Sequence, residues 1–141
     1  MKLLVYFMPW LTDTPIAHRG LHDKTIPENS LKAFEKAVVA GYPIELDVFL
    51  TPDEQLVVFH DNKLQRLCQQ EGLIWETPWE RLSQCKLKGT DQEIPLLSEL
   101  LDLVDGRVPV MVEIKYQPKY QKLVDAVENA LKEYKGEFVI S

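Results

Sequence analysis

The sequence is poor in cysteine, which limits how the fold can be stabilised. Cys68 and Cys85 are the only cysteines among the 141 residues. Two cysteines are too few for a disulfide scaffold, and their spacing does not resemble that of a zinc site. We therefore expect both to be ordinary thiols in the folded chain, and we base no conclusion about the redox compartment on them.

A long hydrophobic run is also absent. The apolar N-terminal stretch covers only residues 2–11, whereas a membrane-spanning helix needs about 20 apolar residues. No small-residue cleavage site follows it, so the stretch does not resemble a signal peptide. We expect it to cover the core as a strand or loop. Weak membrane association through residues 1–11 is the alternative, because Tyr6 and Trp10 are residue types that suit a lipid interface.

Positive charge is scarce as well. The chain has 16 Lys and Arg residues against 22 Asp and Glu residues, which gives a net charge of -6. A protein that binds nucleic acids needs a basic face, so this balance argues against a nucleic-acid partner but permits a local cationic pocket for one phosphate. The length suffices for one globular domain with a core. We expect a cytoplasmic location.

Strands and helices are predicted to alternate along the chain, which indicates the α/β class. Apolar positions at helical spacing predict helices over residues 30–40, 97–104 and 118–134. Short apolar runs predict strands at residues 16–19, 44–48, 56–59, 110–115 and 137–141. Because parallel strands need long crossover connections, this order predicts a mostly parallel sheet.

Single residues predict where some of these elements begin and end. Asn29 or Ser30 can cap the first long helix, and Gly41 suits a left-handed stop after it. Residues 62–76 are polar and are expected to be irregular. Thr77 is expected to cap a short helix that follows this stretch.

Three carboxylates occur within two of the apolar strands. Alternation along the strand at 44–48 places Glu45 and Asp47 on one face. Glu113 and Lys115 share a face in the same way further along the chain. Neighbouring like charges on a buried strand are unfavourable unless a cation meets them. Three carboxylates suit a hard divalent cation, Mg²⁺ or Ca²⁺.

The remaining charged groups near strand ends fit chemistry at phosphorus. His18 and His60 each follow an apolar stretch and can act as general base and general acid. Arg19 and Lys115 supply donors matched to phosphate oxygens. Together with a hard cation, these groups can carry out displacement at a phosphate. Asp61 either orients a neighbouring residue or caps a turn, and the sequence leaves both alternatives open.

In combination these motifs resemble the glycerophosphodiester phosphodiesterase family. The resemblance covers residues 16–141, and each motif occurs in the order that the family shows. The motifs are Ala17-His18-Arg19-Gly20, Pro27-Glu28-Asn29-Ser30 with Ala33-Phe34, Ile44-Glu45-Leu46-Asp47-Val48, Val58-Phe59-His60-Asp61, Ile94-Pro95 with Leu100, and Val112-Glu113-Ile114-Lys115.

The resemblance implies an eight-stranded TIM barrel that uses a divalent cation to hydrolyse glycerophosphodiesters to an alcohol and glycerol 3-phosphate. Residues 51–92 resemble the small insertion that follows the second barrel strand. The implied roles are metal binding for Glu45, Asp47 and Glu113, acid–base catalysis for His18 and His60 (with His18 preferred as base and His60 as acid), phosphate binding for Arg19 and Lys115, and bracing of the first loop and the metal site for Glu28.

The chain departs from the family in length. The strands at 16–19, 44–48, 110–115 and 137–141 would be barrel strands one to four, so residues 1–141 form a partial domain with about half of the barrel. Three outcomes stay open: self-association, pairing with a separate second half, or a truncated and non-catalytic product. A lysophospholipid-directed phosphodiesterase acting at a membrane surface is a further alternative.

Overall fold

The computed structural model describes residues 8–141, and a parallel sheet lies at its centre. The strand order is β1 (Ala17–His18), β2 (Ile44–Leu50), β4 (Val110–Ile114) and β5 (Phe138–Ile140). All three neighbouring pairs in this order are parallel, which confirms the predicted α/β class. A further strand, β3 (Leu56–Val58), pairs antiparallel with β2.

The N-terminal prediction falls largely outside the described residues. Whether residues 1–7 cover the core or associate with a membrane is therefore not addressed by the structure. The first described element is a short helix, α1 (Trp10–Asp13), whose Trp10 side chain is buried. Among residues 8–141, none of the helices combines the length and the apolar character that crossing a membrane requires.

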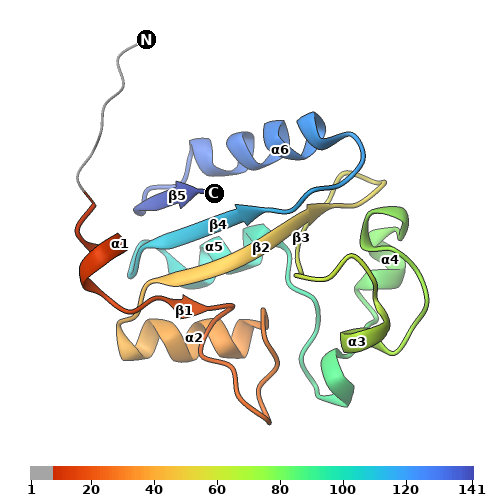
Figure 1. Ribbon diagram of the computed structural model, residues 1–141, viewed down its shortest axis with the longest axis horizontal. Coiled ribbons are helices and arrows are strands. Elements are labelled where there is room, and N and C mark those ends of the chain that lie inside the picture. Colours follow the sequence, from red (N-terminus) through yellow and green to blue (C-terminus); the bar gives the residue numbers. More distant parts are fainter. Residues whose placement is uncertain (1–7) are drawn as a thin grey trace.

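Three long helices flank the sheet and bury one of its faces. They are α2 (Leu31–Ala40), α5 (Leu97–Val104) and α6 (Tyr120–Lys132), and each lies in the connection between two parallel strands (Figure 1). The main core combines apolar side chains of these helices with alternate residues of β2, namely Ile44, Leu46 and Val48. The intervening residues of β2 face the other way, so the predicted alternation is confirmed.

The ends of α2 follow the sequence prediction. The Ser30 hydroxyl accepts a hydrogen bond from the Ala33 backbone N–H at 3.2 Å, so Ser30 is the cap. Gly41 ends the helix in the left-handed conformation, with φ of 78°. Glycine adopts this conformation without the steric strain that a Cβ atom would cause.

Residues 51–92, called the insertion below, lie beyond the C-terminal ends of the parallel strands (Figure 1). Besides β3 they form α3 (Gln65–Cys68), η1 (Ile74–Glu76), α4 (Trp79–Leu82) and η2 (Leu87–Gly89). A second apolar core holds them together, and its fully buried side chains include Phe59, Leu67 and Ile74. The boundaries 51–92 themselves remain a prediction.

Two predictions about the insertion are wrong. Residues 62–76 are not irregular, because α3 and η1 form within them. Thr77 does not cap α4, because its hydroxyl donates to the Leu73 carbonyl oxygen at 2.8 Å and so closes the turn of η1 instead. Helix α4 begins after Pro78 without a side-chain cap.

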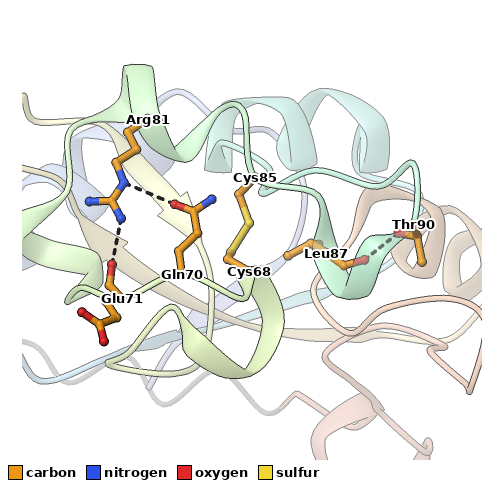
Figure 2. Close-up of a disulfide and its surroundings, with 7 residues drawn as sticks. All are labelled: Cys68, Gln70, Glu71, Arg81, Cys85, Leu87 and Thr90. Atoms are coloured by element: carbon orange, nitrogen blue, oxygen red, sulfur yellow. Dashed lines mark hydrogen bonds between the residues drawn. A yellow bond between two sulfur atoms is a disulfide. The ribbon is translucent and has the colours of Figure 1, made fainter.

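The prediction of two ordinary thiols is also wrong. Cys68, the last residue of α3, forms a disulfide with Cys85, which follows α4 (Figure 2). Their Cα atoms are 5.6 Å apart, within the usual range for a disulfide. Both cysteines are buried in the second core. Composition could not reveal this pairing, because it depends on how the short helices of the insertion pack.

The sheet is not closed within residues 8–141, as predicted for part of a TIM barrel. Its outer strands are β1 and β5, and in the described chain each pairs with a single neighbour. On β5 the side chain of Ile140 is exposed. The chain thus presents two sheet edges, and backbone groups at such edges are able to pair with further strands.

Reduction of the Cys68–Cys85 disulfide is expected to lower the free energy of unfolding. The bridge spans 17 residues, and restricting an unfolded loop of this length stabilises a protein by about 3 kcal/mol. Urea titrations of the chain with and without a thiol reductant, followed by tryptophan fluorescence, measure the change. Trp75 and Trp79 pack against the second core and report on it.

The double variant Cys68→Ser/Cys85→Ser is the control for this measurement. Its urea midpoint is expected to lie below that of the oxidised chain and to be unaffected by the reductant. Equal midpoints for the oxidised and reduced wild-type chain would contradict the prediction.

Candidate active site

Two neighbouring strands bring the three predicted metal ligands together. Glu45 and Asp47 lie on β2, and Glu113 lies on β4 directly opposite Asp47. One carboxylate oxygen from each residue lies within 4.8 Å of the others. These three carboxylates, called the acidic cluster below, occupy the face of the sheet that points away from the main core. The strand register therefore produces the predicted convergence.

Two carboxylates of the acidic cluster are buried, and each has one oxygen that lacks a hydrogen-bond partner among the described residues. Asp47 is 0% exposed and Glu45 is 7% exposed. Within the described chain, Glu45 Oε1 and Asp47 Oδ1 have no hydrogen-bond partner. Burial, together with the charge of Asp47, raises the pKa of Glu45 to about 7. Burial also raises the pKa of Asp47. A divalent cation would satisfy both oxygens, and an all-carboxylate donor set suits Mg²⁺ or Ca²⁺, so the residues fit such an ion.

The two predicted phosphate-binding residues lie beside the acidic cluster. Arg19 follows β1, its backbone N–H donates to Glu45 Oε2 at 3.2 Å, and its Nε is 3.6 Å from Asp47 Oδ2. Lys115 follows β4, and its Nζ donates to Glu113 Oε1 at 3.1 Å and lies 3.6 Å from Asp47 Oδ1. Both cations thus stand where they could contact an anion bound next to the carboxylates.

A tight turn after β1 places Arg19 there. Arg19 and Gly20 both adopt positive φ, at 59° and 81°. A Cβ atom at residue 20 would lie 2.8 Å from Ala33 Cβ on α2, so only glycine allows this close approach. The turn is closed by Asn29, whose backbone N–H donates to the Arg19 carbonyl oxygen at 2.9 Å.

Asn29 also contacts the acidic cluster, although the sequence analysis named it only as a motif residue and a possible helix cap. Its side-chain Nδ2 donates to Asp47 Oδ2 at 3.1 Å, and it is almost completely buried. Its φ of 53° lies in the left-handed region, which asparagine tolerates better than most residues. The neighbouring cap, Ser30, was the signal in the sequence that the chain turns at this point.

The two histidines occupy different surroundings. The side chain of His18 is 66% exposed, and its Nε2 is 3.7 Å from Glu45 Oε2. His60 is half-buried, and its Nδ1 is 2.8 Å from Asp61 Oδ1. His60 and Lys115 line one open cavity of about 430 Å³. Two larger surface cavities, of about 510 and 520 Å³, are lined neither by these histidines nor by the acidic cluster. Cavity size alone therefore does not identify the site.

Asp61 orients a neighbour, which decides between the two alternatives that the sequence left open. Hydrogen bonds from Arg66 and His60 lower the pKa of Asp61 to about 2, so Asp61 is a carboxylate and can only accept hydrogen bonds. The hydrogen on the His60 ring therefore lies on Nδ1. In the neutral ring this leaves Nε2 as the nitrogen without a hydrogen.

Glu28 contacts Arg19 and not the acidic cluster. Its Oε2 accepts a hydrogen bond from Arg19 Nη1 at 2.8 Å, and Arg66 also donates to both of its oxygens. Burial opposes ionisation of Glu28, but the two arginines outweigh it and lower its pKa. The predicted bracing of the first loop is thus visible as a contact. Arg66 was missed, because it lies in the stretch expected to be irregular.

Gln117 is a second residue that sequence reasoning missed. Its side chain is buried, and its Oε1 accepts from the Leu50 backbone N–H at 2.8 Å. Its Nε2 donates to the Leu50 carbonyl oxygen at 3.1 Å. The segment that follows β4 and carries Lys115 is therefore tied to the end of β2.

Comparisons with known proteins point to one family. The family model described as "Glycerophosphoryl diester phosphodiesterase family" matches residues 18–138. A glycerophosphodiester phosphodiesterase of Bacillus altitudinis is 37% identical over 88% of this chain and 53% of its own length. A rat protein, lysophospholipase D GDPD1, is 34% identical over 86% of this chain and 42% of its own length.

A solved structure with the same arrangement of elements is that of a phosphodiesterase from Oleispira antarctica in complex with the product sn-glycerol-3-phosphate. The TM-score is 0.82 and the identity 27%, and the match covers 93% of this chain and 58% of the other. The chain therefore spans about half the length of the relatives that it matches.

Without divalent ions, the free energy of unfolding is expected to fall as the pH rises from about 4.5 to about 7. Glu45 has a pKa of about 7 in the folded chain and an ordinary value of 4.5. Between these values the folded chain keeps a proton that the unfolded chain has lost, so this contribution is complete below about 4.5 and is lost as the pH rises through 7. Urea titrations across this range in a chelator measure it.

Two variants test whether Glu45 causes this dependence. Glu45→Gln is expected to make the pH profile shallower, whereas Glu128→Gln, which changes an exposed carboxylate on α6, is expected to retain it. Excess Mg²⁺ at alkaline pH is expected to restore the stability of the wild-type chain. Parallel profiles for the wild type and Glu45→Gln would count against the assignment.

Proposed function

The chain belongs to the glycerophosphoryl diester phosphodiesterase family, and on this premise we propose that its site hydrolyses glycerophosphodiesters to an alcohol and sn-glycerol 3-phosphate. The observation that carries the proposal is the acidic cluster, flanked by Arg19, Lys115 and His18 at the ends of parallel strands. These are the carboxyl ends of the strands, where parallel α/β proteins bind their ligands. The Oleispira antarctica phosphodiesterase binds sn-glycerol-3-phosphate, which supports the proposed product.

Glu45, Asp47 and Glu113 would hold one divalent cation, Mg²⁺ or Ca²⁺. When bound, such an ion polarises a phosphoryl oxygen and offsets the charge that develops on it. Arg19 and Lys115 bind the other phosphate oxygens, since both already face the carboxylates and donate from fixed positions.

The two histidines move the protons. In the proposed reaction an oxygen nucleophile, either water or the glycerol 2-hydroxyl of the substrate, forms a bond to phosphorus and gives its proton to His18. The bond from phosphorus to the alcohol oxygen breaks, and His60 protonates that oxygen from Nε2. Attack by water gives sn-glycerol 3-phosphate directly, whereas attack by the 2-hydroxyl gives a cyclic phosphate that a water molecule then opens in a second step. The contact with Asp61 supports His60 as the acid, because a carboxylate at Nδ1 stabilises the doubly protonated ring.

A lysophospholipid is the second candidate substrate. The name of the rat relative, a lysophospholipase D, supports the same cleavage in a substrate with one acyl chain. The apolar residues that precede the buried Trp10 would then contact the lipid surface. Co-sedimentation with lipid vesicles that is lost on deletion of residues 1–11 would support this candidate, and no binding would remove it.

The direct test is the release of glycerol 3-phosphate from glycerophosphocholine by the purified chain. Metal-dependent turnover is expected with Mg²⁺ or Ca²⁺ and none with a chelator. His18→Ala is expected to lower the rate by roughly 10²–10⁴-fold, the usual contribution of a general base. Lysophosphatidylcholine, assayed in parallel, separates the two substrate classes.

Light scattering on the same sample tests the open alternatives about chain length. Turnover by a species of twice the chain mass would support self-association. A soluble monomer that turns over neither substrate would mean that the chain alone is non-catalytic, and that a second half has to be added to test the site.

Asp47→Ala is expected to abolish divalent-ion binding, because Asp47 is the most deeply buried ligand of the acidic cluster. Isothermal titration with Mg²⁺ and with Ca²⁺ measures the binding without any need for turnover. Asp102→Ala, which removes an exposed carboxylate on α5, is the matched control and is expected to bind as the wild type does. Unchanged binding by Asp47→Ala would overturn the assignment.

A further inference from the structure

One arginine of the insertion makes an unusual number of contacts to two carboxylates. The Arg66 guanidinium donates to Asp61 from Nε at 2.7 Å and from Nη2 at 2.8 Å. It donates to Glu28 from Nη1 at 2.6 Å and from Nη2 at 3.1 Å. Each carboxylate is therefore held by two hydrogen bonds, an arrangement that fixes both of them in the plane of the guanidinium.

Each of these carboxylates in turn holds a residue of the candidate site. The same Asp61 oxygen that accepts from Arg66 Nη2 also lies 2.8 Å from His60 Nδ1. The same Glu28 oxygen that accepts from Arg66 Nη2 also accepts from Arg19 Nη1 at 2.8 Å. A continuous chain of hydrogen bonds thus runs from His60 through Arg66 to Arg19.

We propose that Arg66 is a positioning residue, which fixes the His60 ring through Asp61 and the Arg19 guanidinium through Glu28. An effect of Arg66 on catalysis rests on the proposed function. The hydrogen bonds from which its positioning role is argued are independent of that function. Arg66 itself does not touch the acidic cluster among the described contacts, and it reaches His60 and Arg19 only through the two carboxylates.

Charge balance explains why the positions depend on Arg66. Without its guanidinium, Asp61 loses two hydrogen bonds and can rotate away from His60. Glu28, which is 6% exposed, would keep only Arg19 as a cationic partner. A buried carboxylate attracts a lone partner strongly, so Arg19 would be drawn toward Glu28 and away from Asp47, which is 3.6 Å from Arg19 Nε.

Helix α3 provides a fixed base for Arg66. A helix of four residues is not stable by itself, but two neighbours of Arg66 anchor this one. Leu67 is fully buried in the second core, and Cys68 is bonded to Cys85 (Figure 2). The insertion therefore holds a charged group over the site at a defined place.

A purely structural role for Arg66 is the competing explanation. Glu28 lies 38 residues from Arg66 in the sequence, so the ion pair also joins the first loop to the insertion. That role predicts a loss of stability without a change in the state of the His60 ring. The ring nitrogens of His60 are therefore the decisive readout.

The experiment measures the ¹⁵N chemical shifts of the histidine rings by long-range ¹H–¹⁵N NMR of the whole chain at alkaline pH. The His60 signals are assigned with His60→Gln. In the wild type the proton is expected on Nδ1. In Arg66→Ala a mixture of the two neutral tautomers is expected, because Asp61 is released, and Arg66→Lys is expected to recover the Nδ1 form only in part.

Arg81→Ala is the matched control, because Arg81 is an arginine of the same insertion with contacts elsewhere. Its Nε donates to Gln70 Oε1 at 3.2 Å and its Nη2 to the Glu71 carbonyl oxygen at 2.8 Å (Figure 2). This variant is expected to leave the His60 shifts unchanged. If Arg66→Ala does not fold, Arg66→Gln is measured in its place with the same expectation.

Turnover gives a second readout that depends on the proposed function. Arg66→Ala is expected to lower kcat by about 10–100-fold, the usual effect of removing a partner that orients a site residue. In an Asp61→Asn background the same substitution is expected to have a smaller effect. An Nδ1 proton that persists in Arg66→Ala would overturn the inference, whatever the turnover. Absence of turnover in the wild type would mean that the chain alone is non-catalytic, and the ring shifts would still decide the inference.

Discussion

The burial of two like charges on one strand is the constraint on which the site depends. Alternation along β2 forces Glu45 and Asp47 onto one face while the other face packs against the helices. Neither carboxylate can reach bulk water freely, so the surrounding segments supply partners: Arg19 from the end of β1, Asn29 from the first loop and Lys115 from the end of β4. These partners leave two of the carboxylate oxygens without a hydrogen bond among the described residues, so the cluster could hold a metal ion.

The insertion contributes side chains to this site. His60 follows its strand β3, and Arg66 on its helix α3 donates hydrogen bonds to both Asp61 and Glu28. The second core and the disulfide stabilise this segment separately from the main core. Each core therefore supports a different part of the site. The main core holds the strands that carry the acidic cluster, and the second core holds the insertion, which carries Asp61 and Arg66.

Much of the fold and the cluster could be predicted from the sequence because both follow from local periodicity. Strand alternation determines which side chains share a face, so the placement of Glu45 and Asp47 on one face required no knowledge of distant contacts. The position of Glu113 opposite Asp47 depends in addition on the pairing of β2 with β4. The pairing of Cys68 with Cys85 and the contacts of Arg66 depend on how short helices pack, which no period in the sequence encodes. Thr77 fitted a capping pattern, but the preceding turn offered its hydroxyl another acceptor.

The contact of Gln117 with Leu50 replaces a strand by a side chain. Its amide gives one donor and one acceptor to the backbone of β2, the same pair of bonds that a neighbouring peptide group would make. Among side chains, only those of Asn and Gln end in this group. A glutamate at 117 would be similar in shape and would still lack the donor for the Leu50 carbonyl. The Gln117 side chain therefore extends the hydrogen bonding of β2 past Val48, the last β2 residue that pairs with β4, and it ties the segment that carries Lys115 to the end of β2.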